Sequence, residues 1–185
     1  MVARSHLNAA ATMKLDGEYV LLAGISKLRI RNHDEFIQNI RTINTRVAIQ
    51  AIDARFVGGK EHVLSVLQQS LQAKKRGTIL SNRIEIDILM RLACTNQISR
   101  ALDDIGLKNG INDVLIIALG KIADLKMVEK HLKKNYRLSK SVFALSGTKI
   151  RALSSHHKIG KQELNACIDE NKLASILAER ANLLW

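Results

Sequence analysis

The stretch from Gly59 to Gly120 reads GKEHVLSVLQQSLQAKKRGTILSNRIEIDILMRLACTNQISRALDDIGLKNGINDVLIIALG. Apolar residues recur in it every three or four positions along three successive runs, which is typical of amphipathic helices. We predict helices from Lys60 to Ala73, from Ser81-Asn82 onward, and from Thr95-Asn96 to Gly106. The last run, Asp113–Leu119, is apolar without interruption, as in a strand that is buried on both faces. This order predicts a sheet covered by helices.

The flanking sequence adds elements of the same kinds. Tyr19–Ile30 is rich in apolar and β-branched residues, which predicts a strand in which Gly24 marks a bulge or turn. Asn32 and Glu35 form a capping-box pattern at the start of a helix that ends near Thr45. Other expected elements are a strand at Val47–Val57, a helix at Lys121–Asn135, a short edge strand at Val142–Leu145, and helical segments at Thr148–Leu153, Gly160–Ile168 and Asp169–Leu184. The 185 residues therefore predict a single domain of the mixed α/β class, with a small sheet covered by helices.

Polar residues predict where two of the central helices begin. Asn82 and Glu85 form a second capping-box pattern, and Asn96 or Thr95 is expected to cap the following helix. In that following helix, the residues expected to point inward are Ile98, Ala101, Leu102 and Ile105.

The helix that begins at Asn82 carries one strongly polar stripe. Arg83, Asp87 and Arg91 lie four residues apart, so the acid can pair with either base. We therefore expect one arginine of the stripe to remain uncompensated at the surface.

The charge balance indicates a polyanionic partner. Lys and Arg number 29 against 17 Asp and Glu, which gives a net charge of +12. Such a field concentrates nucleic acid, although a solvated basic surface without a partner is the simpler alternative. Aromatic residues make up only 3%, which argues against a protein that stacks successive bases on exposed rings. Contacts to phosphate and to nucleic-acid shape are expected instead.

No motif indicates catalysis or metal binding. Cys94 and Cys167 lie far apart in the sequence, and the adjacent pair His156-His157 lacks the spacing of two ligands on one helix face. There is no phosphate-binding loop. We expect a non-enzyme without metal or cofactor. The sequence shows no signal-peptide core and no apolar run of membrane-spanning length, so we also expect a cytoplasmic protein without a membrane partner.

Three segments carry a family resemblance: ARFVGGKEHVL at Ala54–Leu64, SNRIEIDILMRL at Ser81–Leu92, and TNQISRALDDIGLKNG at Thr95–Gly110. The last has a polar Gln-Ile helix start, an alanine one turn on, a glycine stop and a second glycine before the strand. Together they resemble the small kinase-binding subunit of the KEOPS complex, the PRPK-binding protein family, which is found throughout archaea.

The resemblance implies a non-catalytic role in making threonylcarbamoyladenosine in transfer RNA. It implies direct binding to a small atypical kinase-like ATPase, indirect contact through that kinase with the threonylcarbamoyl-transferase subunit, and help in recruiting transfer RNA by its 3′ CCA end. A free-standing basic RNA-binding protein of the ribosome-associated type is the alternative. That alternative explains the charge but leaves an apolar stripe near the C-terminus without a role.

The candidate RNA-binding residues lie around the basic helix end and the starts of the next two helices. They are Lys60, His62, Lys74, Lys75, Arg76, Asn82, Arg83, Arg91, Asn96, Gln97 and Arg100. Helix N-termini offer unpaired N–H groups to anions, and exposed basic connections suit phosphate. Each signal also has a structural interpretation: Asn82 and Asn96 are typical caps of the two helices, and the basic residues stabilise a helix C-terminus.

The C-terminal helix, predicted at 169–184, is the candidate kinase interface. Its candidate residues are Leu173, Ile176, Leu177, Arg180 and Leu184. An apolar stripe there can dock on the protein's own core or face a partner. The helix at Lys121–Asn135 carries Lys126, Lys130 and Lys134, which we interpret as a solvated face.

Overall fold

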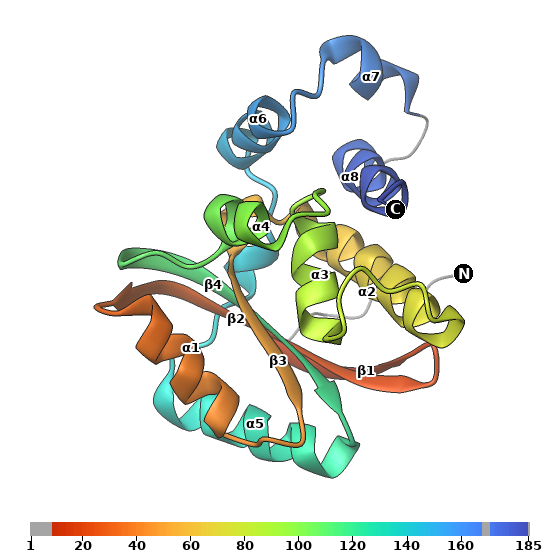
Figure 1. Cartoon of the computed structure of the whole chain (residues 1–185). Helices are drawn as coiled ribbons and strands as arrows, with labels where there is room; N and C mark the ends of the chain where they lie inside the picture. Colours follow the sequence, from red (N-terminus) through yellow and green to blue (C-terminus); the bar gives the residue numbers. More distant parts are fainter. Residues whose placement is uncertain (1–8, 168–170, 185) are drawn as a thin grey trace.

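The computed structural model describes residues 9–167 and 171–184. Its sheet has four antiparallel strands in the order β1-β2-β4-β3, namely β1 Ala10–Leu15, β2 Glu18–Ile30, β4 Gly110–Gly120 and β3 Ala48–Asp53 (Figure 1). β4 is paired on both sides, and helices cover both faces of the sheet around it. Its position explains why the sequence of β4 is apolar without interruption, since residues from Val114 to Ala118 have no polar surface to meet.

The helices are α1 His33–Thr42, α2 Gly59–Arg76, α3 Ile84–Leu92, α4 Ile98–Ile105, α5 Ile122–Asn135, α6 Gly147–His156, α7 Lys161–Ala166 and α8 Lys172–Asn182, with short 3-10 turns η1 at Ala54–Phe56 and η2 at Lys140–Phe143. On one face of the sheet, Leu21 of β2 packs in a cluster with Leu125 of α5 and Ile40 of α1. On the other face, Val20 packs with Val63 of α2 and with residues of α3. Successive strand residues point to opposite faces, so β2 contributes to both cores.

The C-terminal helices form a smaller layer beyond α2 and α3 (Figure 1). Its apolar cluster consists of Leu153, Ile159, Leu173, Ile176 and Leu177. α8 packs along α2 and also contacts α3. Gly58 permits this close approach, because a Cβ at that position would lie only 2.8 Å from Cδ1 of Leu177.

The predicted fold class is confirmed, and the sheet is purely antiparallel. The Asn32 cap is also confirmed, because its side chain accepts hydrogen bonds from the backbone N–H groups of Asp34 and Glu35 at 3.1 and 3.2 Å. The bulge in β2 falls between Ile25 and Leu28 rather than at Gly24. β1 was not predicted from the sequence.

The predicted edge strand at Val142–Leu145 is wrong. Residues Lys140–Phe143 form the turn η2, which crosses over Gly24 of β2, and an isolated antiparallel bridge to β2 lies just before it, between Leu138 and Ile25. A Cβ on Gly24 would lie 2.2 Å from Val142 and 2.4 Å from the Ser139 carbonyl oxygen. The missing side chain therefore makes room for this crossing segment.

The predicted caps of α3 and α4 are also wrong. α3 begins after Arg83 and α4 begins after Gln97, and neither of these N-cap residues caps its helix with a side-chain hydrogen bond. Ala101 and Ile105 of α4 point inward as predicted, whereas Ile98 and Leu102 remain 44% and 42% exposed. The part of the last predicted helix that precedes Asn171, including Asp169, lies outside the described residues.

Candidate nucleic-acid and partner interfaces

Polar side chains of α2 and α3 hold the C-terminal helix in place. Arg91 is buried and donates from Nε to Asp87 at 3.0 Å and from a terminal nitrogen to the carbonyl oxygen of Ala181 at 3.0 Å. Asp87 also accepts from the backbone N–H of Leu80 at 2.7 Å. Gln69 of α2 donates to the carbonyl oxygen of Ala178 at 2.8 Å. These bonds attach the last turns of α8 to the body of the protein.

This geometry corrects the expectation for Arg91. The predicted polar stripe does not face solvent, because Asp87 and Arg91 are both buried and paired with each other. Arg83 is exposed, but it pairs with Glu85 rather than standing free. Arg91 therefore positions α8 and cannot offer its charge to RNA in this structure.

His62 is likewise wrong as an RNA contact. Its ring is fully buried, and Nδ1 accepts a hydrogen bond from the backbone N–H of Gly58 at 3.1 Å. Burial lowers the pKa of His62 to about 3, with smaller contributions from His157 and Lys149. The sequence signal was weak, since one histidine in the first turn of a helix gives no indication of which way it points. His62 instead lies in the buried interface between α2 and the C-terminal layer.

The basic end of α2 remains a candidate for binding an anion. Lys74, Lys75 and Arg76 are exposed, and Lys75 forms an ion pair with Asp16 in the β1–β2 turn at 2.9 Å. Arg76 and Asn96 line a groove of about 510 Å³ between the end of α2, α3 and the end of α8. Apolar groups of the groove come from Ile79, Leu80 and Met90. The groove thus combines a cation with apolar surface.

The buried Arg91 also lines this groove, but the other predicted RNA residues do not. Arg83 lines a separate hollow beside β3 with Arg41 and Arg46. Arg100 pairs with Asp104 at 3.5 Å and lines a hollow beside the end of α8. The remaining candidates are Lys60, half-buried at the start of α2, and the exposed Asn82 and Gln97. The predicted set therefore spreads over several surfaces.

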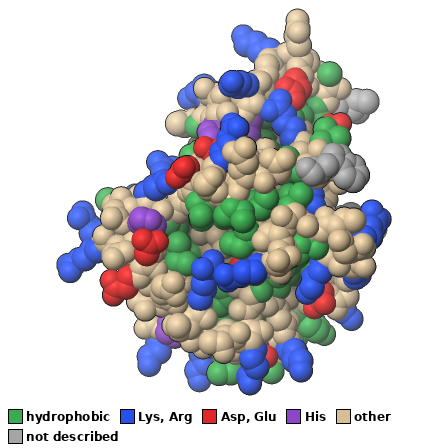
Figure 2. Space-filling view, in the orientation of Figure 1, with side chains coloured by type: hydrophobic (Ala, Val, Ile, Leu, Met, Phe, Trp, Pro, Cys, Tyr) green, Lys and Arg blue, Asp and Glu red, His purple; other side chains and the backbone are tan. Residues whose placement is uncertain are grey.

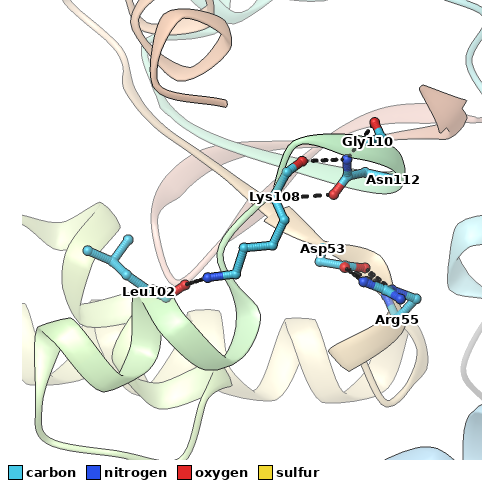
Figure 3. A network of polar contacts seen from close by, with 6 residues as sticks. All are labelled: Asp53, Arg55, Leu102, Lys108, Gly110 and Asn112. Atoms are coloured by element: carbon cyan, nitrogen blue, oxygen red, sulfur yellow. Dashed lines mark hydrogen bonds and ion pairs between the residues drawn. The ribbon is translucent and has the colours of Figure 1, made fainter. Parts of the chain in front are cut away.

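Several residues in and directly after the segment Thr95–Gly110 have structural roles. Asn112 lies buried behind the turn between α4 and β4, where it donates to the carbonyl oxygens of Lys108 and Gly110 at 2.8 and 3.1 Å (Figure 3). The amine of Lys108 donates to the carbonyl oxygen of Leu102 at 3.3 Å. Gly110 has a φ of +118°, which favours glycine. This network fixes the entry into β4.

The match to a known family covers most of the described structure. Residues 28–181 match the family described as kinase binding protein CGI-121. The chain belongs to this family. The match confirms the resemblance to the small kinase-binding subunit of KEOPS and extends it through α8. A comparison with curated proteins finds no match.

In this CGI-121 family member, the apolar stripe of α8 is part of the core. Leu173, Ile176 and Leu177 are buried against α2 and the α6–α7 region, so they do not form a free surface. The expectation that they contact the kinase is therefore not supported, because the protein's own side chains cover them. Arg180 donates to Glu163 at 2.8 and 3.0 Å and holds α7 against α8.

Leu183, which directly follows α8 and is 65% exposed, is a candidate interface residue that the apolar stripe of the helix does not predict. Leu183 and the half-buried Leu184 line the hollow of about 420 Å³ that also includes Arg100 and Arg180. Leu183 lies one residue beyond the end of α8. Helical periodicity does not indicate there which side chains point inward. On the face drawn in Figure 2, Lys and Arg side chains surround a central group of apolar side chains.

No group of three or more His, Cys, Asp or Glu side chains among residues 9–167 and 171–184 is placed to hold a metal ion. Within the same part of the chain, no helix is both long and apolar enough to cross a membrane.

Proposed function

We propose that this CGI-121 protein is the non-catalytic, kinase-binding subunit of a KEOPS-type complex that makes threonylcarbamoyladenosine in transfer RNA. The observation that carries the proposal is the match of residues 28–181 to a kinase-binding family. The chain contacts the kinase directly and reaches the threonylcarbamoyl-transferase subunit only through it.

The end of α8 is the surface that best fits the kinase. Leu183 is an exposed apolar side chain, and Arg100 and Arg180 line the same hollow. An apolar anchor bordered by arginines is typical of the residues that dominate protein interfaces. The buried apolar residues of α8 pack against the rest of the protein and so hold this surface in place.

The groove at the end of α2 is the surface that best fits the 3′ CCA end of transfer RNA. Arg76 supplies a positive charge for phosphate, and Lys74 extends it along α2. The half-buried Ile79 and Leu80 supply apolar surface on which an unstacked base can lie. Single-stranded RNA ends are recognised by this combination of base and phosphate contacts.

Two measurements test the proposal. The tagged chain is expressed with the kinase subunit and purified, and a stable complex is the expected result. The isolated chain is then titrated with labelled transfer RNA with and without the terminal CCA, and the shortened RNA should bind more weakly. Equal binding of the two RNAs, without co-purification of the kinase, would favour the free-standing RNA-binding protein instead.

A further inference from the structure

The exposed side of α5 has a positive charge that the described structure does not neutralise. Lys126, Lys130 and Lys134 are exposed and recur every four residues, a spacing of about 6 Å along the helix. None of the three forms an ion pair or hydrogen bond within residues 9–167 and 171–184. Some exposed cations elsewhere do face acids, as in Arg55–Asp53 at 2.5 Å and Lys75–Asp16 at 2.9 Å.

The acidic residues of α5 are engaged away from this side. Asp124 is buried and accepts from Asn44 at 3.0 Å and from Arg46, and these bonds lower the pKa of its carboxyl group. Glu129 pairs with Lys133 at 2.6 Å and accepts a long hydrogen bond from Thr12 at 3.5 Å. The three free lysines therefore have no acid on their own helix to neutralise them.

The positive surface continues onto neighbouring elements. Lys14 of β1 is exposed and lies on the same side of its strand as Thr12, which contacts α5. Arg137 is exposed just beyond the end of α5. We define Lys14, Lys126, Lys130, Lys134 and Arg137 as the α5 basic surface.

We propose that the α5 basic surface binds the phosphate backbone of a nucleic acid. A row of unpaired cations complements a row of phosphates, and the contact needs no base recognition. An anionic membrane is the less favoured partner, because the apolar side of α5, formed by Leu125, Val128 and Leu132, is already buried in the core. The exposed large apolar residues of α5 are Ile122 and Met127, which is too little for a helix that inserts into lipid.

This inference deepens the proposed function, on which the identity of the nucleic acid as transfer RNA rests. α5 covers the opposite face of the sheet from α2, so its surface is separate from the groove proposed for the CCA end (Figure 1). A transfer RNA is large enough to reach both. The CCA groove would then select the RNA end, and the α5 basic surface would add affinity that depends on salt but not on sequence.

The test compares two variants of the full chain with equal net charge. The first is Lys126→Gln, Lys130→Gln and Lys134→Gln together, and the control is Lys140→Gln, Arg151→Gln and Lys161→Gln, which are exposed positions on other elements. Affinities for transfer RNA with and without CCA are measured by fluorescence anisotropy between about 50 and 200 mM salt. Thermal melting confirms that both variants are folded.

We expect the α5 variant to bind both RNAs more weakly than the control and to lower the slope of log K against log salt by about three, one unit for each lost phosphate contact. Equal slopes in the α5 variant and the control would overturn the inference. It would also be overturned if wild type bound phosphatidylserine vesicles, the α5 variant lost that binding, and its RNA affinity were unchanged. Loss of the CCA effect in wild type, with the α5 difference retained, would contradict the proposed CCA groove alone.

Discussion

The buried ion pair of Arg91 and Asp87 is the residue-level contact that ties α8 to α3. Replacing Arg91 with alanine would leave Asp87 buried without its partner and would break the bond to the Ala181 carbonyl oxygen. Removing one member of a buried pair typically costs about 3 to 5 kcal/mol. We expect a loss of unfolding free energy of this size in urea titrations of Arg91→Ala.

The matched control is Arg100→Ala, which breaks an exposed i,i+4 pair with Asp104. Exposed pairs contribute about 0 to 1 kcal/mol, so this variant should unfold almost as wild type does. A loss of stability in Arg91→Ala no larger than in Arg100→Ala would show that Arg91 does not hold α8.

Because His62 is buried, we expect the folded protein to lose stability in acid. Burial lowers its pKa from 6.5 to about 3, so between these values the unfolded chain binds a proton that the folded chain does not. The stability from this residue is complete above pH 6.5 and decreases as pH falls toward 3. Each pH unit in that window should raise the unfolding constant about tenfold for one such histidine. His157, whose pKa burial lowers to about 4, acts in the same direction.

The measurement is denaturant unfolding at several pH values for His62→Gln, which can still accept from Gly58 but does not titrate. We expect a shallower pH dependence than in wild type. His131→Gln, at an exposed position of α5, is the comparison. The same pH dependence in both variants would contradict the role of His62.

At the scale of elements, α8 contains a core position, Ile176, and is followed directly by a surface position, Leu183. Ile176 is buried, so Ile176→Asp should destabilise the fold by placing an unpaired charge in the core. Leu183 is exposed, so Leu183→Asp should keep the melting temperature of wild type. If Leu183 anchors the kinase, its loss should weaken association by about 2 kcal/mol, or roughly thirtyfold. Calorimetry with purified kinase measures this, and unchanged affinity would exclude Leu183 from the interface.

The C-terminal turn of α2 predicts a charge effect on RNA binding. Lys74→Glu with Arg76→Glu changes two exposed cations, whereas Lys75 is already paired with Asp16. We expect the double variant to lose most of the preference for transfer RNA with CCA and to lower the salt slope by about two. Arg151→Glu with Lys161→Glu is the charge-matched control. A CCA preference equal to that of the control would exclude this helix end from the CCA contact.

At the scale of the whole molecule, the sheet separates the α5 basic surface from the two surfaces proposed for the kinase and for the CCA end, which adjoin each other at Leu184. α5 lies on one face, whereas α2, α3 and the docked α8 lie on or beyond the other (Figure 1). Because the α5 basic surface lies on the face opposite the kinase surface, we expect transfer RNA to stay bound to it when the kinase binds. Adding saturating kinase to the labelled RNA complex should give a larger complex in a mobility-shift assay. Release of free RNA by the kinase would show that the two sites overlap.

The sequence by itself determined the elements whose signals are local. The uninterrupted apolar run of β4 predicted a strand buried on both faces, and Asn32 predicted the start of α1. The segments Ala54–Leu64, Ser81–Leu92 and Thr95–Gly110 also determined the family, which the match over residues 28–181 confirms. These signals succeed because an uninterrupted apolar run and a helix-capping side chain are both encoded by residues that lie close together in the chain.

Only the tertiary structure decided which polar and apolar side chains are exposed. The spacing of Arg83, Asp87 and Arg91 is the same whether solvent or α8 lies against it, and docking of α8 buries Arg91. The apolar stripe of α8 likewise fits a core or a partner equally well, and contact with α2 makes Ile176 and Leu177 core residues. Burial depends on residues far apart in sequence, such as Arg91 and Ala181, and helical periodicity carries no information about which distant segment packs there.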